Sequence, residues 1–173
     1  MKIEPTMVLD ARLAEPADLP VVMEILAEAA EWLTEQGIDQ WPSPPNEHWQ
    51  RRMMEAIKRE EVYTFGIVKN RFGIARFTWS DPYWPDDGLA GYVHSMAIRP
   101  KMHGQDVGRT ILSWAIIKAM RQKKQFLRLD CLAKNGRLRR YYEDQGFLYR
   151  GEYIDRDYVA ALYEKPIPLQ VQK

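Results

Sequence analysis

The pattern of apolar and polar positions changes within residues 91–120. A largely apolar run with partial alternation is typical of a strand, and Pro100, which lacks an amide donor, ends it. Apolar residues then recur at helical spacing, at Val107, Ile111, Trp114, Ala115 and Met120. The pattern predicts a strand, a loop containing Gly104 and a helix, which together direct backbone amides at one point and suit a phosphate. A strand–helix crossover of any α/β domain has the same pattern.

Hydrophobic periodicity predicts the other elements in the same way. We expect strands at residues 7–13, 62–68, 73–79, 126–132, 147–154 and 158–163, and further helices at residues 19–36, 47–59 and 135–145. Asp18 is the expected N-cap of the first helix, and Gly37 and Gly146 are expected to end helices. This order predicts the α/β (α+β) class, with a mixed, mostly antiparallel sheet flanked by about four helices.

Composition limits the class of protein. The chain has 173 residues, of which 46% are hydrophobic, and a net charge of +1, which favours one globular domain over residues 1–173. The single cysteine, Cys131, suits a reducing cytoplasm and reads as a small core residue. No run has the length of a membrane span or of a signal peptide's apolar core. The near-neutral net charge and the lack of a recognised nucleic-acid-binding motif argue against binding to nucleic acid. The spacing of His48, His94, His103 and Cys131 predicts no metal site.

The near-neutral net charge hides an asymmetry. Residues 99–150 contain 13 Lys or Arg against 4 Asp or Glu, whereas residues 1–61 contain 6 basic and 13 acidic residues. This distribution indicates that the basic part binds an anionic ligand and the acidic part a cationic one. Alternatively, the solvent-exposed helix faces differ in charge by chance.

Two stretches resemble one known family. S-M-A-I-R-P-K-M-H-G-Q-D-V-G-R-T-I-L resembles the acetyl-CoA-binding motif of the GNAT superfamily of N-acetyltransferases, in which an apolar strand end and a Pro precede R/Q-x-x-G-x-G/A at a helix start. N-G-R-L-R-R-Y-Y-E-D-Q-G-F resembles the second motif of that family, an Asn-led helix with a Tyr and a closing Gly-Phe. The expected element order agrees with the GNAT fold over essentially the whole chain.

The resemblance implies acetyl-CoA as the cofactor and assigns residues to it. Backbone groups of Met96, Ala97 and Ile98 would bind the pantetheine arm, and Asn135, Leu138 and Tyr142 would contact the cofactor further along. The pyrophosphate would be bound by the loop and helix start, at His103, Gly104, Gln105, Asp106, Val107, Gly108, Arg109 and Thr110.

Counted from Pro100, His103 stands at the family's Arg or Gln and Asp106 at its middle glycine. Another register, starting at Gln105, restores the glutamine and breaks the spacing. Asp106 would cap the helix or repel a pyrophosphate, and Asn135 alternatively serves only as a helix cap.

The reaction implied by the resemblance is direct acyl transfer to an amine, which needs a base and an acid. Tyr142, rather than the adjacent Tyr141, matches the family's tyrosine, and a phenol with a pKa of about 10 suits a thiolate whose conjugate acid has a pKa of about 8.5. His94 lies two residues before Met96, on the strand where some relatives carry a base or water relay. A structural histidine is the alternative.

The acceptor amine is expected in the acidic first third. Asp39 and Trp41 would bind a cation by charge and ring face, with Gln40 and Trp32 nearby, although core packing also explains Trp32. Many family members dimerise, so a homodimer is expected. The competing hypothesis, motivated by His103 and Asp106, is a GNAT-fold CoA-binding or partner-binding module without turnover.

Overall fold

The computed structural model describes residues 9–168, in which seven strands and four α-helices are present. The strands form one sheet in the order β1-β2-β3-β4-β5-β7-β6, and the neighbours β4 and β5 pair in parallel. The expected mixed, mostly antiparallel sheet with about four helices is therefore confirmed.

By backbone contacts the chain divides into two compact units. The first comprises Met1–Arg76 and Ser95–Ile111, and the second comprises Phe77–His94 and Leu112–Lys173. Strands β3 (Asn70–Thr78) and β4 (Ala90–Ile98) and helix α3 (Val107–Arg121) contribute residues to both units. The expectation of a single domain over residues 1–173 stays a prediction.

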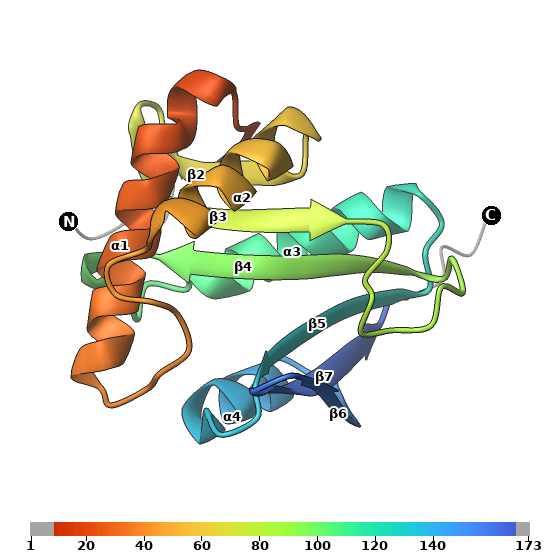
Figure 1. The fold of residues 1–173 in the computed structure, drawn as a ribbon. Coiled ribbons are helices and arrows are strands. Elements are labelled where there is room, and N and C mark those ends of the chain that lie inside the picture. Colours follow the sequence, from red (N-terminus) through yellow and green to blue (C-terminus); the bar gives the residue numbers. More distant parts are fainter. Residues whose placement is uncertain (1–8, 169–173) are drawn as a thin grey trace. The chain divides into compact units, whose positions relative to one another are not determined.

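In the first unit, helices α1 (Leu19–Glu35) and α2 (Glu47–Lys58) pack on antiparallel strands (Figure 1). Strand β1 (Asp10–Leu13) pairs with β2 (Val62–Ile67), and β2 pairs with β3. The core between helices and strands consists of aliphatic side chains such as Ile25, Leu26, Met53 and Ile74. Each of these four is at most 1% exposed, so burial of helix faces against the sheet stabilises the unit.

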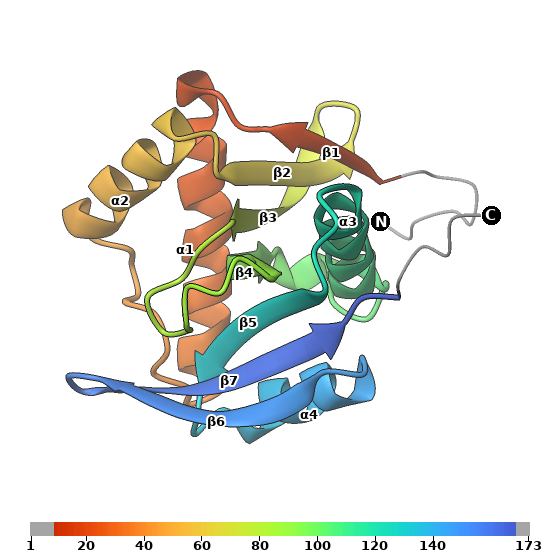
Figure 2. The same ribbon diagram turned by 90° about the vertical axis from the view of Figure 1, so that its right-hand side faces the viewer.

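The second unit contains the remaining strands and helix α4 (Gly136–Asp144), as Figure 2 shows. Strand β5 (Phe126–Leu132) pairs with β7 (Tyr158–Pro166), and β7 pairs with the edge strand β6 (Leu148–Asp155). Buried Arg128 on β5 contacts Glu164 and Asp87 at 2.8 Å each. These two carboxylates compensate its charge inside the sheet.

Two expectations need correction. Asp18 occupies the N-cap position of α1, but its side chain makes no capping bond. Its carboxylate instead accepts from the Glu15 amide and contacts Arg12, across a 3₁₀ turn (Pro16–Asp18) that hydrophobic periodicity does not predict. The turn expected at residues 69–71 lies at Val68 and Lys69, so β3 begins at Asn70. The part of the first expected strand at Met7 and Val8 lies outside the described residues.

None of the helices within residues 9–168 has the length and apolar character needed to cross a membrane.

Candidate active site

The expected phosphate loop lies within the first unit, between β4 and α3. A second 3₁₀ turn (Pro100–Met102) follows β4, and Arg99 before it binds Glu24 at 3.1 Å and also Glu28, both on α1. Gly104 and Asp106 then adopt left-handed backbone conformations, with φ of +76° and +57°. L-residues pay a steric cost there, and Asp is one of the few residue types that tolerate it. Glycine adopts such a φ without steric cost, and the assignment of Asp106 to the motif's middle glycine, in the register counted from Pro100, stays a prediction.

Helix α3 begins directly after this loop. The amide of Thr110 donates to the Asp106 carbonyl at 3.0 Å, and the Thr110 hydroxyl donates to the same oxygen at 3.0 Å. The amides of Val107, Gly108 and Arg109 precede this bond, in the first turn where amides have no acceptor within the helix. They present the positive end of a 15-residue helix. This donor set fits an anionic diphosphate.

Strand β4 has an irregularity close to the expected pantetheine contacts. Ser95, within the strand, has a φ of +48°. Immediately after it, Ala97 is buried, whereas Met96 and Ile98 are half-buried. The Ile98 carbonyl already accepts from Nε2 of His103 at 3.3 Å, so a pantetheine amide would have to share this oxygen.

In the second unit, Asn135 and Tyr142 hold α4 in place. The Asn135 side-chain oxygen accepts from the Leu138 amide at 3.1 Å, which is the expected helix cap. Tyr142 is 5% exposed, and its ring lies 5.8 Å from Phe147 and 6.1 Å from Tyr163. Burial raises the pKa of Tyr142 well above its usual value, and neighbouring Cys131 adds to the effect. Its phenol therefore stays protonated over the neutral range.

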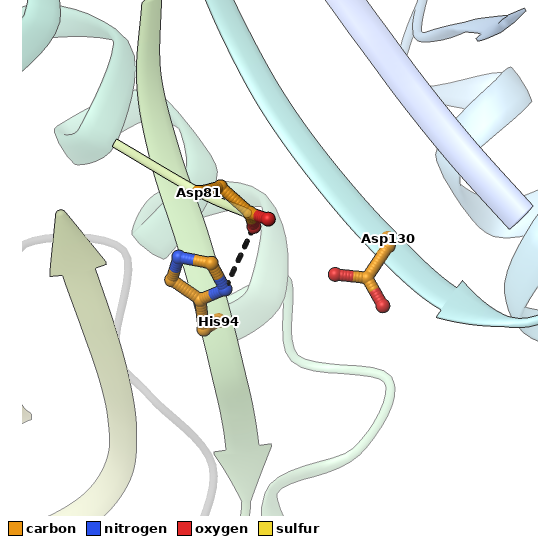
Figure 3. Close-up of side chains that lie close together, drawn as sticks. All are labelled: Asp81, His94 and Asp130. Atoms are coloured by element: carbon orange, nitrogen blue, oxygen red, sulfur yellow. Dashed lines mark ion pairs between the residues drawn. The ribbon is translucent and has the colours of Figure 1, made fainter. Parts of the chain in front are cut away.

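His94, on the second unit's part of β4, has defined partners. Its Nδ1 lies 3.4 Å from Oδ2 of Asp81, and its Nε2 lies 2.9 Å from Oγ1 of Thr78 (Figure 3). Asp81, His94 and Asp130 each offer one atom, and these three atoms lie within 4.8 Å of one another. The charge of Asp130 also contributes to the raised pKa of Tyr142.

Sequence reasoning missed Asp81, Asp130 and Thr78. Asp81 follows the end of β3, and Asp130 interrupts an otherwise apolar end of β5. A charged residue within an apolar strand is unusual, and this was the one sequence feature that could have drawn attention to Asp130. Only the pairing of β4 with β5 indicates that Asp130 lies beside His94.

The residues expected to bind the acceptor lie in the first unit. Trp32 packs edge-on against His103, with ring centroids 4.8 Å apart. Trp41 packs against Trp49 at 5.9 Å and lies against the aliphatic core. Asp39 is exposed. Core packing thus accounts for Trp41, and the assignment of this loop to the acceptor stays a prediction.

Comparisons with known proteins agree with the fold and the motifs. The family model "Acetyltransferase (GNAT) family" matches residues 26–147, more than two thirds of the chain, so the chain belongs to the GNAT acetyltransferase family. YesJ of Bacillus subtilis strain 168, described as an uncharacterized N-acetyltransferase, is 28% identical over 160 residues, which cover 87% of this chain and 89% of YesJ.

Solved structures share the fold. A GNAT-family acetyltransferase from Streptococcus agalactiae is 20% identical, with a TM-score of 0.76, over 91% of this chain and 95% of its own. The PaiA N-acetyltransferase of Thermoplasma acidophilum, solved in complex with coenzyme A, is 16% identical, with a TM-score of 0.70, over 92% of this chain and 99% of its own. The GNAT family uses acetyl-CoA.

Proposed function

We propose that the protein transfers an acetyl group from acetyl-CoA to a primary amine of a small molecule or peptide, by direct transfer. The observation that carries this proposal is the left-handed backbone conformation of Gly104 and Asp106, immediately before α3. In a member of the GNAT family, the amides that follow these two residues, at the start of the helix, would bind the diphosphate of acetyl-CoA. A reducing cytoplasm suits the single buried thiol, Cys131.

The residues assigned to acetyl-CoA are those that the motif implies. Backbone groups of Met96, Ala97 and Ile98 would bind the pantetheine arm, and the amides from Gly104 to Arg109 would bind the diphosphate. Lys101 and Arg109 are exposed and would add positive charge. When bound, acetyl-CoA supplies an acetyl group on a thiolate leaving group.

Two residues of the second unit would handle the protons. His94 would take a proton from the acceptor ammonium, since a primary amine attacks only through a free lone pair. Tyr142 would hold the proton that the departing thiolate needs, and its raised pKa keeps that proton in place.

The test combines binding with turnover. We expect acetyl-CoA to bind with micromolar affinity in a calorimetric titration, and thiol release to accompany acetylation of at least one member of a panel of primary amines. A thiol reagent can follow this reaction because burial raises the pKa of Cys131, the chain's own thiol, to about 12. Absence of acetyl-CoA binding would refute the proposal.

A second candidate function is favoured by the charge of Asp106, which replaces a neutral glycine in the motif. A CoA-binding or partner-binding module would bind CoA and show no turnover over the same panel. Acetylation of any amine in the panel would exclude this candidate.

A further inference from the structure

Asp81, His94 and Asp130 form a compact polar cluster within the second unit. They come from the loop after β3, from β4 and from β5, and Figure 3 shows their functional groups turned toward one another. One atom of each lies within 4.8 Å of the other two. Asp81 is buried, whereas His94 and Asp130 are half-buried.

Thr78 determines which nitrogen of His94 carries the proton. The Thr78 hydroxyl donates to the Ser80 carbonyl at 2.8 Å, and a carbonyl oxygen can only accept. Because the hydroxyl has one proton, its 2.9 Å contact with Nε2 of His94 requires an N–H on that nitrogen. When His94 is neutral, Nδ1 therefore has the lone pair, and when His94 is protonated, its Nδ1–H forms an ion pair with Oδ2 of Asp81, 3.4 Å away.

Both carboxylates are held by donors outside the cluster. Oδ1 of Asp81 accepts from the Tyr83 amide at 2.6 Å, and Oδ2 of Asp130 accepts from the Tyr158 hydroxyl at 3.4 Å. With ionised carboxylates the cluster has a net negative charge whether His94 is neutral or protonated, and with a neutral imidazole its three groups are all acceptors. Such a group attracts a cation that has several N–H donors.

The spacing suits an ammonium group. Hydrogen bonds from N⁺–H to O⁻ measure about 2.7–2.9 Å. The side between Nδ1 of His94 and Oδ2 of Asp81 is 3.4 Å and the other two sides are at most 4.8 Å, so a nitrogen just above the plane of the three atoms can lie at this distance from each. A tetrahedral Zn²⁺ with bonds of about 2.1 Å requires ligands about 3.4 Å apart, which the pair of Nδ1 of His94 and Oδ2 of Asp81 already satisfies, so a metal ion is the competing occupant that the test has to separate.

We propose that Asp81, Nδ1 of His94 and Asp130 form the subsite for the acceptor ammonium, and that the substrate is accordingly a cationic primary amine. This inference rests on the proposed acetyl transfer. In the proton step, an N–H bond of the ammonium breaks and an H–Nδ1 bond forms on His94. The amine lone pair becomes free, and the imidazolium is stabilised by Asp81 until its proton passes to solvent.

Histidine NMR tests the subsite without turnover. The chain has three histidines, and His94→Ala assigns the ring signal of His94. Titration with n-butylamine or 1,4-diaminobutane should shift this signal saturably, whereas n-butanol, which has no charge, should not. In Asp130→Asn we expect the midpoint of the amine titration to rise at least about tenfold. Asp144→Asn, which removes an exposed carboxylate of the same unit, is the matched control and should leave the midpoint unchanged.

The outcomes separate this inference from the proposed function. Lack of a His94 response to both amines in the wild-type protein would overturn the subsite, and that comparison needs no variant to fold. A one-to-one response of His94 to ZnCl₂ without any response to amines would identify a metal site and also overturn it. Acetylation with an unchanged KM for the amine in Asp130→Asn would refute the subsite alone. A saturable amine response without acetylation would retain the subsite and refute the transferase.

Discussion

Substitutions at Asp106 can separate the effect of its negative charge from the effect of its left-handed backbone conformation. Its side chain is 76% exposed and lies 3.9 Å from Arg109, so water and this cation screen its charge. Asp106→Asn keeps a residue that tolerates the left-handed region and removes the charge. Because a diphosphate is anionic, we expect Asp106→Asn to bind acetyl-CoA about threefold to tenfold more tightly in calorimetric titration.

Two further variants control for conformation. Asp106→Gly should bind at least as tightly as Asp106→Asn, because glycine adopts a φ of +57° without steric cost. Asp106→Ala should lose about 1 kcal/mol of stability in urea unfolding, since alanine pays that cost without a polar side chain to offset it. Equal acetyl-CoA affinity in wild type and all three variants would contradict this expectation and mean that the charge of Asp106 does not act on the bound diphosphate.

Tyr142 is expected to act through its hydroxyl. Tyr142→Phe keeps the buried ring and should lower kcat at least about 100-fold, with little change in the affinity for acetyl-CoA. Because the pKa of Tyr142 is raised, the acid form persists as pH increases, and its deprotonation should cause no loss of kcat below about pH 10. Steady-state kinetics across pH measures both effects.

The neighbouring tyrosine provides the comparison for Tyr142. Tyr141→Phe should retain most of kcat, because Tyr141 does not match the family's tyrosine. A large loss in Tyr141→Phe together with an active Tyr142→Phe would reassign the acid.

At the scale of elements, Gly91 shows how closely α3 packs on β4 within the second unit. A Cβ added at Gly91 would lie 2.5 Å from the Phe77 ring and 3.2 Å from the Cβ of Ala119. Gly91→Ala should therefore cost about 1–3 kcal/mol of unfolding free energy, as overpacking does in other cores. Gly136→Ala, in the first turn of α4 with no atom within 4 Å of the added Cβ, should be neutral or stabilising by up to about 1 kcal/mol. Urea denaturation measures both, and equal effects would contradict this packing.

Elements that depend on local pattern could be predicted from the sequence, and those that depend on distant partners could not. Strand β5 has the expected bounds, and Asn135 caps α4 as its position indicated. The left-handed φ of Ser95 has no such signal, because a serine within an apolar run reads as ordinary strand. Asp81 and Asp130 are 49 residues apart, and only strand pairing brings them to His94.

At the scale of the whole molecule, the sheet ends in the edge strand β6, where exposed apolar side chains stand beside exposed Arg150, Glu152 and Asp155. Strand β6 is last in the sheet order, and its exposed residues include Leu148 at 49%, Tyr149 at 44% and Ile154 at 70% exposure. A long edge strand with exposed apolar side chains pairs readily with another chain unless it is covered. We therefore predict a homodimer in which a second copy covers β6.

Light scattering at micromolar protein tests this prediction. The wild-type protein should have twice the mass of one chain, and Ile154→Lys should shift it to the monomer, because a lysine at a covered edge leaves a buried, unpaired charge. Ile117→Lys is the matched control: Ile117 is 48% exposed on α3, away from the edge strand, and its replacement should leave the mass unchanged. A monomeric wild-type protein, or equal dissociation in both variants, would show that β6 is not the interface. If Ile154→Lys alone dissociates and the monomer retains full acetylation, the edge serves assembly and contributes nothing to the reaction.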